Sequence, residues 1–304
     1  MRNHRTVLSL LTGLAALTLT LAACGGSEER SGTATGPSDQ GACSDASEGD
    51  LLAEVCERGT LTVSTDPAYP PQSSFDKDSG GYEGFDIDVA TEIAARLGVE
   101  VAWEEPAWEV LTAGRWNDRW QMSVGSMTPT NDRQRVLNFT EPYYFTPAVV
   151  VVHEDNTSVS DVTTDLDGAE IGVCSACTYE QYLNKSLVIK GFEFDFMIDD
   201  ATVTGYDTDT TALQDLSLGD GARLDAVITS LTTAQRFAAD QPVKIVGEPV
   251  FYEPLSVAID KNSQADPASF TEAVDTIVGE MHEDGTLTEL SKKWYDGVDL
   301  SVQQ

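Results

Sequence analysis

Two patterns of hydrophobic residues, one strand-like and one helix-like, alternate along the chain between residues 60 and 240. Short runs of apolar and β-branched residues, typical of buried strands, are each followed by a segment with apolar residues at helical spacing. The strand-like runs are 61–65, 122–127, 170–173 and 226–229, and the helix-like segments that follow them are 86–97, 131–137, 179–183 and 231–239. This alternation predicts an α/β fold with doubly wound sheets, in which ligands bind at the carboxyl ends of the strands.

The segment 125–144 places a strand end, a helix start and a cation within a few residues. Pro129 cannot continue a strand ladder, and Thr130 is a suitable N-cap for a helix over 131–137. A helix N-terminus carries unpaired N–H donors, and the planar guanidinium of Arg133 in the first turn suits a carboxylate. The segment therefore predicts either an anion site or an ordinary capped helix with a surface arginine.

The N-terminal segment 1–23 is predicted to be a secretory signal peptide. Arg2 and Arg5 precede a charge-free apolar run that is short for a membrane-spanning helix. The small residues before Cys24 resemble a bacterial lipobox, so we expect cleavage before Cys24 and its lipidation. A signal anchor that stays in the membrane is the alternative, and both place the rest of the chain outside the cell. Residues 24–50, rich in Gly, Ser, Thr and acids, are expected to form a flexible tether.

The five cysteines fit an exported protein. With Cys24 set aside for lipid, the hypothesis is two local disulfides, Cys43–Cys56 and Cys174–Cys177. A zinc half-site and a thioredoxin-like redox pair are the other interpretations of the C-x-x-C pair. The sequence has no second C-x-x-C, its three histidines are scattered, and the aromatic and proline context of a redox motif is missing. We therefore expect structural disulfides, no metal and no cofactor.

The charge of the chain is strongly negative, with 18 basic and 51 acidic residues and a net charge of −33. Such a surface repels nucleic acids and anionic membranes, which argues against DNA or RNA as a partner. Plain solubility, for example in a salty habitat, explains the acidity without a functional role.

Several motifs, taken in order, resemble one protein family. Thr-Asn-Asp-Arg followed by Phe-Thr-Glu-Pro-Tyr-Tyr resembles a segment of the extracellular solute-binding proteins that serve amino-acid ABC importers. Further matching segments are 65–71, 84–88, 224–227, 284–287 and 293–295. The resemblance covers most of the chain from about residue 59 to residue 297. It implies two doubly wound lobes that close around a ligand, as in a Venus flytrap.

Two extended runs, 143–152 and 251–259, are expected to cross between these lobes and to form a two-strand hinge. The predicted domain organisation is 51–147 with 253–297 for the first lobe, 148–252 for the second lobe, and 298–304 for a C-terminal tail.

The resemblance also implies roles for residues of the first lobe. Arg133 pairs with the ligand carboxylate, Thr128 adds an N–H and a hydroxyl, and Gly125 and Ser126 offer backbone groups to an ammonium.

Asp66 and Tyr69 are implied to contact the polar end and the apolar stem of the ligand side chain, which suits a basic or amide group. The alternatives are an Asx-type turn for Asp66 and a core position for Tyr69. Trp108 is implied to be the second aromatic ring against the ligand, although some of the nearby tryptophans belong to the core.

In the second lobe, Cys177 or Thr178 is implied to present N–H donors at the start of a helix. Ser230 stands where amino-acid receptors of the family usually have the aspartate that binds the ligand's α-ammonium. Either another acid such as Asp207 or Asp209 takes that role, or the ligand lacks a primary α-ammonium. A neutral hydroxyl forms a weaker bond to a cation than a carboxylate does.

The resemblance implies a monomeric, lipid-anchored extracellular receptor for an amino-acid-like solute, with an ABC permease as its partner. An enzyme on the same fold, such as a dehydratase or a peptidoglycan-cleaving lyase, is one rival. No nucleophile elbow, metal pattern or lysozyme-like domain supports it, so we expect no enzymatic activity. A ligand-sensing subunit of a signalling complex is the other rival.

Overall fold

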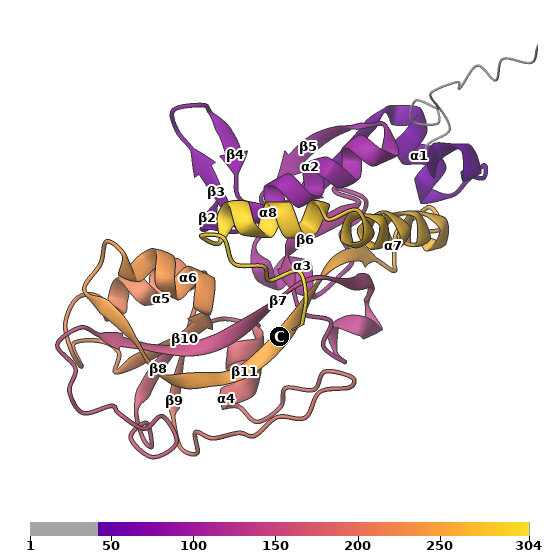
Figure 1. Ribbon diagram of the computed structural model, residues 1–304. Coiled ribbons are helices and arrows are strands. Elements are labelled where there is room, and N and C mark those ends of the chain that lie inside the picture. The colour runs from indigo at the N-terminus through magenta and orange to yellow at the C-terminus, as the bar shows by residue number, and fades with distance from the viewer. Residues whose placement is uncertain (1–41, 304) are drawn as a thin grey trace, which may run out of the picture. The chain divides into compact units, whose positions relative to one another are not determined.

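The structure is a computed structural model that describes residues 42–303. Within these residues, an eight-stranded sheet has the order β5-β1-β6-β11-β7-β10-β8-β9 (Figure 1). Its strands are β1 Thr60–Ser64, β5 Glu100–Glu104, β6 Met122–Met127, β7 Leu137–His153, β8 Glu170–Cys174, β9 Thr202–Tyr206, β10 Ala226–Ser230 and β11 Val243–Asp260. A small antiparallel sheet contains β2 Ala68–Tyr69, β3 Ser73–Asp76 and β4 Gly81–Glu83.

The helices follow the strands as the sequence predicts. They are α1 Leu51–Arg58, α2 Phe85–Leu97, α3 Trp108–Thr112, α4 Thr178–Leu183, α5 Asp209–Leu216, α6 Leu231–Ala238, α7 Ala268–Glu283 and α8 Thr286–Trp294, with short 3-10 helices η1 Ala42–Asp45 and η2 Arg133–Arg135. The expected strand runs and most of the expected helices match these bounds within one residue. None of the helices in residues 42–303 has both the length and the apolar character needed to span a bilayer.

The sheet consists of two parallel parts joined by two long antiparallel strands. β1 is parallel to β5 and β6, and β8 is parallel to β9 and β10. Between these parts, β7 and β11 pair from His153 opposite Val243 to Leu137 opposite Asp260. Figure 1 shows both strands running from one part of the fold to the other. We call the part around β1, β5 and β6 the first lobe and the part around β8, β9 and β10 the second lobe.

The hydrophobic core is divided in the same way. One buried cluster takes residues from 51–144 and 255–300, and two others take residues from 148–251. α2, α7 and α8 pack against the first cluster, whereas α4, α5 and α6 belong to the second lobe (Figure 1). The two-lobed α/β fold predicted from the sequence is thus confirmed.

The predicted helix over 131–137 is wrong beyond a single turn. Only η2 forms there, and Leu137 already begins β7, where it pairs with Asp260. Thr130 still caps the turn, because its hydroxyl accepts a hydrogen bond from the N–H of Arg133 at 3.3 Å. Pairing with β11 therefore takes the backbone groups that a longer helix would need.

Residues 42–50 differ from the expected tether, because several bonds fix them to the first lobe. Cys43 and Cys56 form a disulfide, and the side chain of Asp50 accepts a hydrogen bond from the N–H of Ala53 at the start of α1. The predicted signal peptide, Cys24 and the rest of the tether lie outside the described residues.

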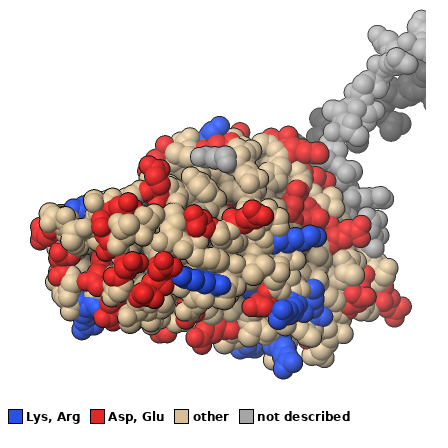
Figure 2. Space-filling view, turned by 90° about the horizontal axis from the view of Figure 1, so that it is seen from below, with Lys and Arg blue, Asp and Glu red and all other residues tan. Residues whose placement is uncertain are grey.

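Carboxylate side chains spread over the whole face of the molecule shown in Figure 2, with basic side chains at a few places. This distribution agrees with the large excess of acidic over basic residues in the sequence.

Candidate functional site

A cavity that is partly open to solvent lies between the two lobes. Many of its lining residues lie at or just after the ends of β1, β6, β8 and β9, so the cavity lies at the carboxyl ends of these strands. Nine of the ten predicted ligand-binding residues line it: Asp66, Tyr69, Trp108, Gly125, Ser126, Thr128, Arg133, Cys177 and Thr178. The residues predicted from their position after strands and those predicted from the family motifs therefore line the same cavity.

Arg133 is the cation of this cavity and is only 3% exposed. Its Nη1 donates to the carbonyl oxygen of Thr128 at 3.0 Å, and its Nη2 donates to the carbonyl oxygen of Ala176 at 2.9 Å. Its Nε has no hydrogen-bond partner, and the guanidinium lies 5.1 Å from the ring centre of Trp108. Burial lowers the pKa of Arg133 to about 10, although nearby Glu253 opposes this shift. The side chain stays charged at neutral pH and keeps a free donor for an anion.

Glu253 is a buried acid in β11 that is not among the site residues predicted from the sequence. Its Oε2 accepts hydrogen bonds from the hydroxyls of Thr128 at 2.6 Å and Thr178 at 2.7 Å. Burial raises the pKa of Glu253, while these bonds and the charge of Arg133 oppose the shift. A single carboxylate oxygen therefore joins a residue of each lobe at the cavity. Its signal in the sequence is an acidic residue inside the extended run 251–259, whose other residues carry no charge.

Asp66 and Tyr69 follow β1 and line the cavity. The Oδ1 of Asp66 accepts a hydrogen bond from the N–H of Ala68 at 2.8 Å, as an Asx-type turn requires, yet Asp66 also lines the cavity. Burial raises the pKa of Asp66, and the backbone hydrogen bond from Ala68 opposes the shift. Tyr69 lines the cavity with its ring and directs its hydroxyl to Ser230 at 3.2 Å.

Ser126 is held at the cavity wall by a buried hydrogen-bond network. Its hydroxyl donates to Asp86 at 2.8 Å and accepts from Tyr144, and its N–H donates to the hydroxyl of Tyr143. Ser126 has a φ of 52°, in the left-handed region that non-glycine residues seldom adopt. Burial raises the pKa of Asp86 to about 7. The network fixes the direction of the Gly125 and Ser126 backbone groups.

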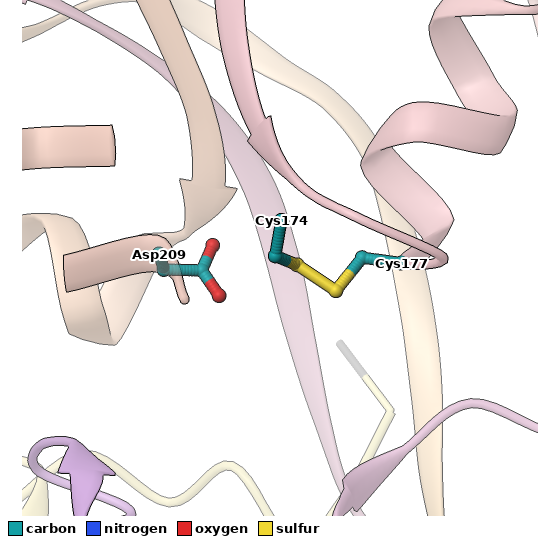
Figure 3. Close-up of side chains that lie close together, drawn as sticks. All are labelled: Cys174, Cys177 and Asp209. Atoms are coloured by element: carbon teal, nitrogen blue, oxygen red, sulfur yellow. A yellow bond between two sulfur atoms is a disulfide. The ribbon is translucent and has the colours of Figure 1, made fainter. Parts of the chain in front are cut away.

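The Cys174–Cys177 pair forms a disulfide in the wall of the cavity. Cys174 ends β8 and Cys177 is the N-cap of α4, and Figure 3 shows the carboxylate of Asp209 directed toward the two sulfurs. The sulfurs and a carboxylate oxygen of Asp209 lie within 4.8 Å of one another, which is a spacing suited to a metal. A disulfide has no thiolate to offer a zinc ion, so this geometry does not support the zinc interpretation.

Ser230 is the one predicted ligand-binding residue that is not among those lining the cavity. It is fully buried, and its hydroxyl contacts those of Tyr69 and Thr233 and the amide of Gln72. The physical reason is closure of the lobes, which places Tyr69 and Gln72 of the first lobe over the end of β10.

Further hydrogen bonds join the lobes around the cavity. The amide of Gln72 donates to the hydroxyl of Thr232 at 2.7 Å, and the hydroxyl of Thr210 donates to the carbonyl oxygen of Ala68 at 2.6 Å. Together with the bond from Arg133 to Ala176, these contacts hold the lobes against each other on several sides of the cavity.

Comparison with known proteins agrees with this architecture. The chain is 30% identical over 253 residues to the L-cystine-binding protein TcyJ of Escherichia coli strain K12, covering 83% of this chain and 88% of the relative. It is 32% identical over 263 residues to the L-cystine-binding protein TcyA of Bacillus subtilis strain 168, covering 84% and 88%.

Two solved structures show the same fold. A mutant of ArgBP from T. maritima has a TM-score of 0.69 and 26% identity, covering 81% of this chain and 99% of that chain. The ancestral amino acid-binding protein AncCDT-1, described as a precursor of cyclohexadienyl dehydratase, has a TM-score of 0.68 and 28% identity, covering 80% and 99%. The model of the bacterial extracellular solute-binding proteins, family 3, matches residues 61–297, and the chain belongs to this family.

Proposed function

We propose that the protein is the substrate-binding lipoprotein of an ABC importer for an amino acid or an amino-acid-like solute. The proposal rests mainly on the environment of Arg133. Its guanidinium is buried, its Nε has no hydrogen-bond partner, and it lines a cavity to which both lobes contribute. A buried donor without a partner is costly, and a carboxylate is the group that a guanidinium binds best. The relatives named above for the binding of cystine support an amino-acid-like ligand.

The proposed cycle uses closure of the two lobes, 51–147 with 253–297 and 148–252. Arg133 and Asp66 contact the ligand from the first lobe, and Cys177 and Thr178 contact it from the second. A ligand that touches both lobes binds the closed form more tightly than the open form, so it shifts the population toward closure. The permease then distinguishes the loaded receptor by its closed shape, and the lipid on Cys24 keeps the receptor at the outer face of the membrane.

An enzymatic function has a weaker basis. It rests on the name of one similar structure as the precursor of a dehydratase, and that protein is itself described as amino acid-binding. Recovery of the bound ligand with unchanged mass after prolonged incubation supports a receptor, whereas conversion of the ligand supports an enzyme.

The test is a thermal-shift screen of the chain from Ser27 onward, which keeps all described residues and both disulfides. The probes are the common amino acids including L-cystine, their betaines and amides, and small peptides. A ligand at a hundredfold excess over its Kd stabilises the folded state by about 2.7 kcal/mol. We expect Arg133→Ala to lose the shift and Arg135→Ala to keep it, because the side chain of Arg135 is 76% exposed. The absence of a shift with every probe contradicts the proposal.

A further inference from the structure

The cavity offers no acid at the position of Ser230, so the cationic group of an amino acid must be received elsewhere. Ser230 is fully buried, and its hydroxyl is occupied by Tyr69, Gln72 and Thr233. It therefore has neither a negative charge nor free space next to a ligand.

Asp209 is the acid of the second lobe that is free for this role. It is 6% exposed and lines the cavity, and its Oδ1 has no hydrogen-bond partner. It is the first residue of α5, but the cap of that helix is Thr208, whose hydroxyl accepts a hydrogen bond from the N–H of Thr211. The carboxylate is thus not needed to cap the helix. Burial raises the pKa of Asp209 to about 7; Thr229 opposes this shift, and no cation contributes to it.

The other acids of the cavity are less suitable. Asp66 uses an oxygen for the N–H of Ala68, and Glu253 accepts hydrogen bonds from two threonines. Asp207 lines the cavity too, but it is exposed and so interacts with solvent. Among these four acids, only Asp209 has a fully buried carboxylate oxygen that lacks a hydrogen-bond partner.

Two unpartnered groups of opposite charge therefore line the same cavity, the Nε of Arg133 in the first lobe and the Oδ1 of Asp209 in the second. Given the proposed receptor function, on which this step rests, we infer that Asp209 binds the α-ammonium of the ligand while Arg133 binds its carboxylate. The ligand is then a zwitterion with both groups, and a betaine or a deaminated acid is a poorer ligand. Because the two groups belong to different lobes, the zwitterion itself draws the lobes together.

The experiment is titration calorimetry on the chain from Ser27 onward, with matched probes that differ only in the α-ammonium. The pairs are L-arginine with 5-guanidinopentanoic acid and L-lysine with 6-aminohexanoic acid. We expect Asp209→Asn to weaken binding of the amino acid by about thirtyfold or more, since the ammonium loses a buried ionic partner. The deaminated partner should lose much less affinity in Asp209→Asn than the amino acid does. Asp240→Asn, which removes the same charge from an exposed site of the second lobe, should change neither affinity.

The possible outcomes distinguish a wrong assignment of Asp209 from a wrong receptor function. If the wild-type protein binds an amino acid and Arg133→Ala abolishes this, but Asp209→Asn does not weaken it, the assignment of Asp209 is wrong and the receptor function stands. The assignment is also wrong if Asp207→Asn, and not Asp209→Asn, weakens binding of the amino acid. If no probe binds the wild-type protein, both the function and the assignment fall.

A defect in folding is recognised because Asp209→Asn then loses the deaminated probe as well. In that case the wild-type protein decides the question through its pH dependence. Below about pH 7 the affinity for the amino acid should fall relative to that for the deaminated acid. Asp66, Asp207, Glu253 and Arg133 also line the cavity, but the ratio for the matched pair cancels their shared contribution. A ratio that does not change with pH contradicts the assignment.

Discussion

The Nη2 of Arg133 donates a hydrogen bond to the carbonyl oxygen of Ala176 at 2.9 Å, which joins the first lobe to the turn closed by the Cys174–Cys177 disulfide. The residue proposed to bind the ligand carboxylate is thus also part of the contact between the lobes. The Arg133 side chain takes part in both ligand binding and lobe closure. We therefore expect ligand affinity to depend on the geometry of its guanidinium as much as on its charge.

Replacement of Arg133 by lysine tests this dependence on geometry. Lysine keeps the positive charge but lacks the planar fork, so it cannot hold Thr128, Ala176 and a carboxylate at the same time. We expect Arg133→Lys to lower ligand affinity by about tenfold to a hundredfold, equivalent to roughly 1.5–3 kcal/mol. Arg135→Lys, at an exposed site, should have no effect in the same calorimetric measurement. Full affinity in Arg133→Lys means that charge alone suffices.

The raised pKa of Asp209 predicts how stability changes with pH in the absence of ligand. Its folded pKa of about 7 exceeds the ordinary value of 3.8, so the folded state binds more protons than the unfolded state between these values. Stability therefore decreases as the pH rises through this window and levels off above pH 7. Between pH 5.5 and 7.5 we expect Asp209 to reduce the free energy of unfolding by about 2 kcal/mol. Urea titrations should show a smaller decrease for Asp209→Asn, and an equal decrease in both proteins contradicts the prediction.

Much of the fold and many of the cavity residues could be predicted because short stretches of sequence indicate where strands end and which residues follow them. Met122–Met127 alternates small and apolar residues and is followed by Pro129, which marks the end of a strand. Arg133 comes shortly after this strand end, where ligands bind in such sheets. Asp66 and Tyr69 follow β1 in the same way. The C-x-x-C spacing likewise led to the disulfide seen between Cys174 and Cys177.

The remaining features depend on contacts between distant parts of the chain. Ser230 is covered by Tyr69 and Gln72, which are more than 150 residues away, and no local pattern encodes this contact. Glu253 lies within a strand, so its direction toward the cavity depends on register. The helix predicted over 131–137 fails because pairing of β7 with β11 overrides local helix preference.

The two disulfides should have different effects when removed. In the chain-entropy model, a cross-link between residues 13 apart stabilises by about 3 kcal/mol and one between residues 3 apart by about 2 kcal/mol. Replacing Cys43 and Cys56 by serine should therefore lower stability without changing ligand affinity, because this bond is absent from the cavity wall. Replacing Cys174 and Cys177 should lower both, since their turn carries the carbonyl of Ala176 and leads into Thr178. Denaturant titration and calorimetry of the two double variants measure these effects, and equal affinity in both argues against a role for the turn.

The charges around the cavity predict its preference among amino acids. Asp66, Asp207, Asp209 and Glu253 line it together with Arg133, so acids outnumber cations among the described residues there. At an effective dielectric constant of about 20, an added positive charge roughly 7 Å from an unpaired carboxylate gains about 2 kcal/mol. The wild-type protein should therefore bind L-arginine at least about tenfold more tightly than L-citrulline, its neutral analogue of similar shape. Asp66→Asn should reduce this difference, whereas Asp78→Asn, at an exposed position in the loop between β3 and β4, should leave it unchanged. Equal binding of L-arginine and L-citrulline by the wild-type protein means that Asp66 does not receive a cationic side chain, and that its role is the turn at Ala68 alone.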